Sequence, residues 1–327
     1  MSFWKSRRVL VTGGSGFVGS HLVEMLLAAG ARVTATGRRA DPPFLLGVLP
    51  QIRFLVGDLE DRRFCRSALE EQDVVMHLAA QVGGVEYNQA HHASLFIDNM
   101  APFLSLLDAA REAQVERMLV TSSACVYPRD PTIPIPEEEG RSGEPEPTNS
   151  GYGWAKRMQE YLGAAFAAQF GLPVAIARPF NAYGPRDDFS PATSHVIPAL
   201  IRRVLADEDP LTVWCSGNQT RGFLFVRDFC EGLMRTAEKY PEADPLNIGA
   251  DEETSIRGLV ELILSITGKH PEVRYDPSRP EGQPRRCCDT RKMERVLGWK
   301  PATPLAEGLR QTIQWYRDRP HDPSCAA

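Results

Sequence analysis

No apolar run in the sequence approaches the length of a membrane-spanning helix, which needs about 20 consecutive residues. Residues 1–20 also lack the apolar core of a secretory signal, because Arg7 and Arg8 lead directly into a short β-rich run. There is no basic excess either. The net charge of −5 offers no attractive field to nucleic acid or to an anionic membrane. We therefore expect a cytoplasmic protein that binds neither nucleic acid nor membranes.

Paired cysteines are lacking as well. The seven cysteines are an odd number and contain no C-x-x-C motif; they are Cys65, Cys125, Cys215, Cys230, Cys287, Cys288 and Cys325. This usage argues against a disulfide framework and against a structural zinc site. We expect a reducing compartment and no metal. The adjacent Cys287 and Cys288 are expected to be packing residues.

Apolar residues make up 43% of the 327 residues, and their arrangement indicates the fold. Short β-rich runs alternate with helical segments along the first half of the chain. The predicted strands are 7–13, 31–37, 52–58, 73–80, 115–123 and 173–180, and the main predicted helices are 16–30, 94–113 and 151–171. Strands that are apolar almost throughout, separated by helices, are typical of a parallel sheet covered on both faces. We predict an α/β fold with a doubly wound parallel sheet of the Rossmann type.

The pattern loosens after residue 180, where shorter elements follow one another. Helices are predicted near 194–206, 228–239, 255–267 and 305–317, and strands near 211–215 and 221–226. These form a smaller C-terminal α/β lobe over residues 181–327, some of whose segments return to the first domain. The stretch 127–151 is rich in Pro, Glu and Gly. It is either a mobile linker or a loop shaped around a ligand.

A glycine-rich turn joins the first predicted strand to the first helix. Gly13, Gly16 and Gly19 in "VTGGSGFVGS" have the spacing that lets backbone N–H groups approach a pyrophosphate at a helix N-terminus. Phe17 and Val18 lie between them. The alternative is a tight turn without a ligand. Its place in a βαβ unit favours dinucleotide binding, which makes residues 1–180 an NAD(P)-binding domain.

The end of the second predicted strand discriminates between the two nicotinamide cofactors. "TATGRRA" has Arg38 and Arg39 where an NAD enzyme carries a carboxylate, and the first acidic residue is Asp41. Two guanidinium groups suit a 2′-phosphate, so we predict NADP. The alternative is NAD beside two solvated loop arginines. Asp58 and Leu59, after the third strand, are assigned to the same cofactor.

Tyr152 and Lys156 lie four residues apart at the start of a predicted helix, and therefore on one face. An ammonium group beside a phenol lowers the phenol pKa, which prepares the pair for proton transfer with a sugar hydroxyl. Tyr-x-x-x-Lys by itself is common on surfaces. It gains weight here from its position, about thirty residues after a serine-rich strand end in a dinucleotide-binding sheet.

These motifs together resemble the extended short-chain dehydrogenase/reductases that act on nucleotide sugars. The resemblance rests on the glycine turn, "HLAAQVGG", Ser123, Tyr152 and Lys156, and it extends to "LGWKPATPLAEGLRQTIQWY" at 297–316. It implies a catalytic triad in which Tyr152 is the acid/base. Ser123 would bond the same substrate oxygen, and Lys156 would bind the nicotinamide ribose.

Within this family, "SSACVYP" and "SHVIPALIRR" resemble GDP-L-fucose synthases and GDP-mannose 3,5-epimerases. That resemblance implies that Cys125 and His195 exchange protons on the carbons beside a transient 4-keto group. Thiols and imidazoles titrate close enough to neutrality for this task. The alternatives are that Cys125 is only a core-packing residue and that His195 is a capping or loop histidine.

The resemblance also implies substrate contacts and an assembly. Asn181 would contact the sugar or phosphate, and Arg221 and Arg286 would clamp the diphosphate, although a turn asparagine and surface arginines are the simpler explanation. The predicted substrate is a GDP-hexose, epimerised at C3/C5 with hydride transfer at C4. A different NDP-sugar 4-epimerase or 4-ketoreductase, or a non-catalytic NADP sensor, are the alternatives. Helices 94–113 and 151–170 would form the interface of a homodimer.

Overall fold

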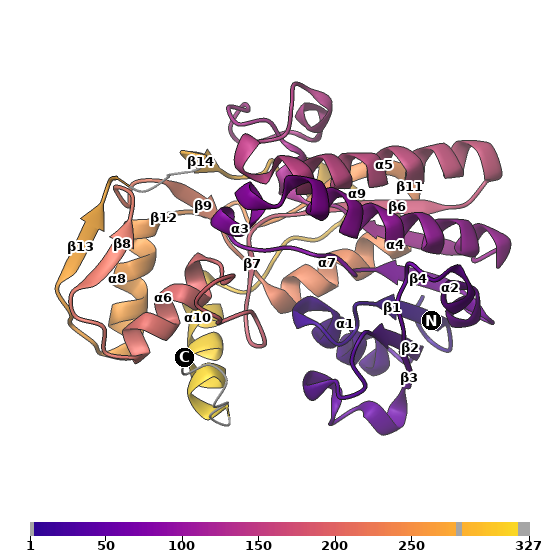
Figure 1. The fold of residues 1–327 in the computed structure, drawn as a ribbon, viewed down its shortest axis with the longest axis horizontal. Helices are drawn as coiled ribbons and strands as arrows, with labels where there is room; N and C mark the ends of the chain where they lie inside the picture. The colour runs from indigo at the N-terminus through magenta and orange to yellow at the C-terminus, as the bar shows by residue number, and fades with distance from the viewer. Residues whose placement is uncertain (1–2, 279–282, 320–327) are drawn as a thin grey trace.

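The computed structural model describes residues 3–278 and 283–319, and its centre is a seven-stranded parallel sheet (Figure 1). The strands are β1 (Arg8–Thr12), β2 (Arg32–Gly37), β3 (Arg53–Val56), β4 (Val74–His77), β5 (Arg117–Thr121), β6 (Val174–Pro179) and β11 (Glu242–Ile248). Their order is β11-β6-β5-β4-β1-β2-β3, and every neighbouring pair is parallel. The predicted doubly wound α/β fold is confirmed. The crevice of such a sheet lies at the carboxyl ends of the strands, where the strand order reverses.

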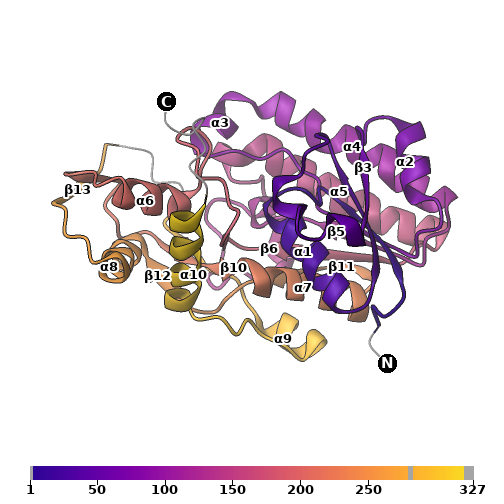
Figure 2. The same cartoon turned by 90° about the horizontal axis from the view of Figure 1, so that it is seen from below.

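Helices cover both faces of this sheet (Figures 1 and 2). One face carries α2 (Arg62–Leu69), α4 (His92–Glu112) and α5 (Ser150–Phe170), and the other carries α1 (Phe17–Ala28) and α7 (Val226–Lys239), with α9 (Arg291–Leu297) beside α7. This double cover explains why the strands read as continuous apolar runs. No helix within the described ranges is both long enough and apolar enough to cross a bilayer.

The edge strand β11 was missed by the sequence analysis. It pairs in parallel with β6, although Pro245 lies within it and the register shifts between Glu242 and Pro245. A proline cannot donate to the ladder, so an edge strand tolerates it best. Helix α7 and strand β11 both follow residue 180 in the chain, yet both pack with the large sheet and not with the C-terminal lobe.

The C-terminal lobe consists of short elements in three small sheets. They are β7 (Ala182–Tyr183), α6 (Val196–Leu205), β8 (Leu211–Trp214), β9 (Thr220–Gly222), β10 (Leu224–Phe225), β12 (Glu253–Ser255), α8 (Ile256–Thr267), β13 (Val273–Asp276), β14 (Arg285–Arg286) and α10 (Leu305–Asp318). Among these, β7, β12, β13 and β14 lie outside the strands predicted from the sequence. A further short helix, α3 (Val85–Ala90), precedes α4.

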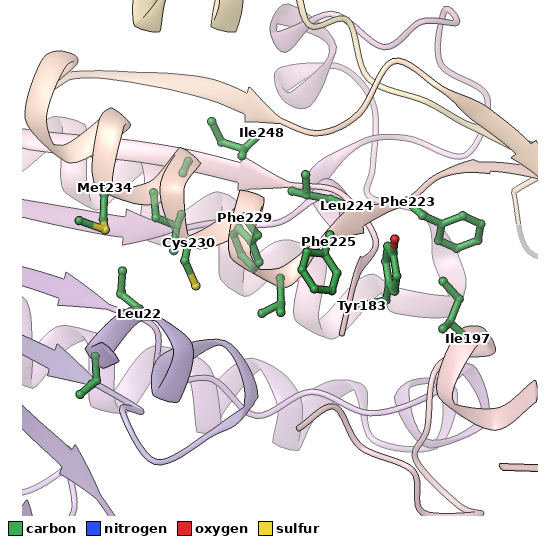
Figure 3. Packing of buried hydrophobic residues seen from close by; sticks show 14 of the residues in the cluster. Leu22, Tyr183, Ile197, Phe223, Leu224, Phe225, Phe229, Cys230, Met234 and Ile248 are labelled. Atoms are coloured by element: carbon green, nitrogen blue, oxygen red, sulfur yellow. The ribbon is translucent and has the colours of Figure 1, made fainter. Parts of the chain in front are cut away.

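One hydrophobic core runs from the large sheet into this lobe (Figure 3). Leu22 of α1 and Cys230 of α7 share it with Tyr183, Ile197 and Phe225. Each large apolar side chain buried there contributes about 1.5–3 kcal/mol. The lobe is therefore packed onto the sheet, and the cleft between them has fixed walls.

The Pro/Glu-rich stretch 127–151 packs against the sheet instead of crossing open space. Arg178 of β6 is fully buried, forms an ion pair with Glu160 of α5 (2.7 Å), and donates to the Glu137 carbonyl oxygen (2.6 Å) and the Tyr127 hydroxyl (3.0 Å). The Tyr127 hydroxyl in turn donates to the Asn247 side chain on β11. These bonds tie the stretch to three elements, so it is packed onto the sheet and is not a linker.

Candidate active site

A cleft of about 810 Å³ opens between the sheet and the C-terminal lobe. It is lined by most of the residues that the sequence singles out: Gly13, Gly16, Phe17, Val18, Gly19, Arg38, Asp58, Leu59, Ser123, Cys125, Tyr152, Lys156, Asn181, His195, Arg221 and Arg286. Arg39 is exposed but is not among the lining residues. Segments separated by more than 250 residues thus meet in one cavity.

The glycine turn brings the N-terminus of α1 to this cleft. Gly13 has a φ of +67°, and a Cβ there would lie 2.9 Å from the Ala79 backbone. A Cβ on Gly19 would collide with the Gly13 carbonyl oxygen, so only glycine allows the helix to approach the turn this closely. The N-cap, Gly16, offers no side-chain oxygen to the first N–H groups. The helix end is therefore suited to a phosphate.

The residues assigned to the adenosine end differ in how they relate to the cleft. Arg38 is exposed directly after β2 and lines the cleft. Asp58 is exposed, and one of its oxygens accepts from the Glu60 backbone N–H (3.0 Å), whereas Leu59 is buried. These residues and the glycine turn fit an adenine dinucleotide, which supplies or accepts hydride when it is bound.

Ser123, Tyr152 and Lys156 meet where β5 ends beside the first turns of α5. Lys156 is buried, donates to the Thr121 carbonyl oxygen (2.8 Å) and Gln159 (3.0 Å), and lies 5.5 Å from the centroid of the Tyr152 ring. Burial lowers the pKa of Lys156 to about 8, against the opposing effects of Cys125 and Glu160. The ammonium can therefore lose its proton more readily than an exposed lysine.

Tyr152 differs from the sequence prediction in one respect. Burial raises its pKa, Cys125 raises it further, and a hydrogen bond with the Ser123 side chain and the charge of Arg286 oppose this only in part. The sequence analysis expected a pKa lowered by Lys156. In the structure the loss of hydration outweighs the Ser123 hydrogen bond and the charge of Arg286, so the pKa of the phenol is raised.

Gly153 was not singled out from the sequence, yet it allows the close packing of the helical turn that carries Tyr152. A Cβ there would lie 2.5 Å from the Cys125 carbonyl oxygen and 2.6 Å from Cβ of Pro145. Without a side chain at this position, the first turn of α5 packs directly on the segment that carries Cys125. The signal in the sequence is the glycine on either side of Tyr152 in "GYG".

Cys125 belongs to a short 3-10 turn, Ala124–Val126, which Ser123 caps by accepting from the Cys125 backbone N–H (3.1 Å). Its sulfur accepts a hydrogen bond from Nη2 of Arg286 (3.4 Å). Cys125 is half-buried and lines the cleft, whereas the other described cysteines, Cys65, Cys215, Cys230, Cys287 and Cys288, are buried. This arrangement differs from a thiol enclosed in the core.

His195 lines the cleft as the N-cap residue of α6. More than a third of its surface is exposed. The pKa of His195 is lowered, chiefly by desolvation; Asp188 opposes this and Arg286 adds to it. A lowered pKa favours the neutral imidazole, which can accept a proton; the imidazolium formed in this way can deliver one.

The predicted substrate contacts have partners within the protein. Asn181 donates its side-chain N–H to the Gly222 carbonyl oxygen (2.9 Å), so it connects β9 to the turn after β6. Arg221 donates to the Thr220 carbonyl oxygen (2.7 Å). Arg221 and Arg286 are register partners on β9 and β14, which places their side chains on one face of the small sheet.

Asp187 is a cleft residue that the sequence analysis missed. One carboxylate oxygen accepts from the Asp188 N–H (2.8 Å), and the other is buried without a hydrogen-bond partner in the described structure. Burial raises the pKa of Asp187 to about 7. Nothing in "GPRDDF" distinguished it from an exposed loop aspartate.

In residues 3–278 and 283–319, no cluster of three His, Cys, Asp or Glu side chains could hold a metal ion.

Known proteins are similar to this chain in sequence. Residues 9–249 match the NAD dependent epimerase/dehydratase family. The chain is 35% identical over 322 residues (96% of this chain and 97% of the relative) to a dTDP-4-dehydro-6-deoxy-D-allose reductase of a Streptomyces species. It is 33% identical over 317 residues (95% and 92%) to the probable GDP-L-fucose synthase 1 of Oryza sativa subsp. japonica.

A solved structure agrees with these relatives. The UDP-glucose 4-epimerase of Thermotoga maritima, crystallised with UDP-glucose, superimposes with a TM-score of 0.86, covering 95% of this chain and 98% of that one at 28% identity. Family, fold and cleft agree in what they indicate. The chain belongs to the NAD dependent epimerase/dehydratase family, the extended short-chain dehydrogenase/reductases, and is an NAD(P)-dependent nucleotide-sugar enzyme.

Proposed function

We propose that this enzyme epimerises C3, C5 or both on a GDP-hexose, through a 4-keto intermediate formed or consumed at C4. The observation that carries the proposal is the cleft, which Cys125 and His195 line together with Ser123 and Tyr152. A thiol and an imidazole in the same cleft supply the two proton-transfer groups that epimerisation requires and that reduction of a ketone does not. The relative named GDP-L-fucose synthase supports the choice of a GDP-sugar.

The chain's own residues divide the proton transfers between them. Tyr152 holds the proton that moves to or from the oxygen at C4, and Ser123 orients that oxygen. A C–H bond next to the ketone breaks when the Cys125 sulfur takes its proton. His195, in its protonated imidazolium form, gives a proton to the opposite face of the same carbon, which inverts the configuration. Lys156 would bind the nicotinamide ribose, and its ammonium electrostatically favours the ionised phenol when Tyr152 loses its proton.

We propose NADP as the cofactor, on the basis of Arg38 at the end of β2. Its side chain is exposed, lines the cleft, and stands where a carboxylate would hold the ribose of NAD. Arg39, which is exposed outside the lining, is the second candidate contact for a 2′-phosphate. Guanidinium groups suit such a phosphate because they bind it through two parallel hydrogen bonds.

We also propose a homodimer formed through α4 and α5. Ile97 and Leu104 lie seven residues apart on one face of α4, and Tyr161 lies on the neighbouring α5. All three are exposed in the single chain, with 59%, 46% and 66% of their surface accessible. A row of large apolar side chains on two adjacent helices suits a four-helix interface.

The test is incubation in D₂O with GDP-mannose or its 4-keto-6-deoxy derivative, with and without NADPH, and analysis of the sugar by NMR and mass spectrometry. Deuterium at C3 or C5 reports epimerisation. Consumption of NADPH separates a net reductase from a redox-neutral epimerase. Replacing Cys125 by Ser abolishes deuterium incorporation and leaves NADP binding intact. Cys65→Ser, a buried cysteine on α2, is the matched control.

A second candidate comes from the dTDP-sugar reductase among the relatives. A dTDP-linked 4-keto-6-deoxy sugar therefore belongs in the same experiment. Reduction of that sugar without deuterium at C3 or C5 would replace the proposed function by a 4-ketoreductase. Wild-type deuterium incorporation in the Cys125→Ser variant would remove the thiol from the mechanism.

A further inference from the structure

Arg286 and Cys125 are 161 residues apart in the chain, yet both line the cleft and their side chains are in contact. Nη2 of Arg286 donates to the Cys125 sulfur over 3.4 Å. The neighbouring Arg285 is different, because its side chain points to the other face of β14 and pairs with Glu253 (2.6 Å). In the described structure no carboxylate pairs with Arg286, and its Nε is buried without a partner. The charge of this guanidinium is directed at the thiol.

The surrounding backbone holds this contact in place. Three residues before Arg286, the side chain of Gln283 donates to the Pro128 carbonyl oxygen (2.7 Å). On the other side of Arg286, the Cys287 carbonyl oxygen accepts from Ile135 N–H (2.8 Å). Both partners belong to the segment that follows Cys125. The strand that carries the arginine is thus tied on both sides to the loop that follows the cysteine.

We propose that Arg286 is a positioning residue for Cys125: it orients the sulfur toward the cleft and pairs with its thiolate form. This inference rests on the proposed function for its role in epimerisation, but the contact itself does not. A thiolate is the proton-accepting form of cysteine, and an adjacent arginine favours it. The five N–H donors of a guanidinium leave others available to a ligand.

The same charge acts on the other proton-transfer groups of the cleft. Arg286 lowers the pKa of Tyr152, against a larger effect of burial, which raises it. Arg286 also lowers the pKa of His195, in addition to a larger effect of burial in the same direction. One guanidinium therefore contacts the thiol and also lowers the pKa of the phenol and of the imidazole. A residue that only clamped a diphosphate would be neutralised by its ligand, without a separate contact to the thiol.

The first test needs no substrate. The rate at which iodoacetamide alkylates Cys125 at pH 7 is followed by mass spectrometry of the peptide that contains it. We expect Arg286→Gln to slow this reaction by about fivefold or more, because the thiolate is the nucleophile. Arg286→Lys keeps the charge and restores part of the rate. Arg285→Gln, on the opposite face of β14, leaves the rate unchanged. An unchanged or faster reaction in Arg286→Gln overturns the proposal.

The second test separates positioning from substrate binding. In Arg286→Gln, deuterium incorporation at the sugar falls by about tenfold or more, while the Kd of GDP measured by calorimetry stays within about threefold. Arg221→Gln, its register partner on β9, instead weakens GDP binding by about tenfold, the effect expected for a lost charged hydrogen bond. Weaker GDP binding in Arg286→Gln with normal alkylation would make Arg286 a diphosphate clamp only. If the wild type incorporates no deuterium from any sugar, the proposed function fails, and the alkylation test still decides on Arg286.

Discussion

Acidification is expected to destabilise the protein through His77, at the carboxyl end of β4 beneath the glycine turn. The ring is buried, and its Nδ1 lies 2.9 Å from Oγ1 of Thr12. That oxygen already accepts from the N–H groups of Leu78 and Ala79 (3.2 Å each), so its own proton is donated to Nδ1. The other ring nitrogen has no partner in the described structure. An imidazolium would therefore be desolvated and would direct a proton at an oxygen with no free lone pair.

The size of the effect follows from the pKa of His77, which burial, aided by the charge of Lys156, lowers from 6.5 to about 3. Below pH 6.5 the unfolded chain binds this proton and the folded chain does not. The stability that neutral His77 provides is complete above pH 6.5 and is lost as the pH falls, by about 1.4 kcal/mol per unit. At pH 4.5 the loss reaches about 2.7 kcal/mol, and it stops growing near pH 3.

The assay is urea unfolding of the wild type and of His77→Asn at pH 7.0 and 4.5, followed by circular dichroism. The asparagine oxygen can accept the Thr12 proton and does not titrate. We expect the wild type to lose about 2.7 kcal/mol more than the variant between the two pH values. His21, whose pKa is lowered to about 4, mainly by burial, contributes equally to both proteins and cancels. Equal losses in the two proteins would refute the reasoning.

Four further predictions concern other parts of the molecule. Gly19→Ala places a methyl group against the turn before α1, so NADPH binding measured by fluorescence weakens by about tenfold or more; an unchanged affinity contradicts the close approach. Arg178→Met leaves the Glu160 carboxylate buried and unpaired and costs about 3–5 kcal/mol in urea unfolding, whereas a loss below about 1 kcal/mol would show that the pair is dispensable. Arg38→Ala weakens NADPH binding by about tenfold and spares NADH, and an equal effect on both would rule out Arg38 as the contact for the 2′-phosphate. If the proposed dimer forms, Ile97→Arg makes the protein monomeric in analytical ultracentrifugation, and a monomeric wild type would rule the dimer out.

The sequence predicted those features that depend on residues close together in the chain. The alternation of apolar strands and helices follows from burial on both faces of the sheet, and it was sufficient for the fold class and for six of the seven strands. The glycine spacing after β1 and the four-residue spacing of Tyr152 and Lys156 are also local. Each places backbone or side-chain groups within one helical turn, whatever the rest of the chain does.

Tertiary structure decided what depends on packing between distant segments. Strand β11 contains Pro245 and reads as a loop, and only its place at the edge of the sheet makes it a strand. Burial is the main influence on the pKa of Tyr152, and the four-residue spacing to Lys156 does not predict how deeply the tyrosine is buried. Arg286 and Cys125 are 161 residues apart in the chain. The guanidinium reaches the sulfur because the segments that carry the two residues are hydrogen-bonded to each other. Local patterns fix which groups a segment can offer; desolvation and charge–charge contacts depend on which other segments surround them, and that is settled only when the chain is folded.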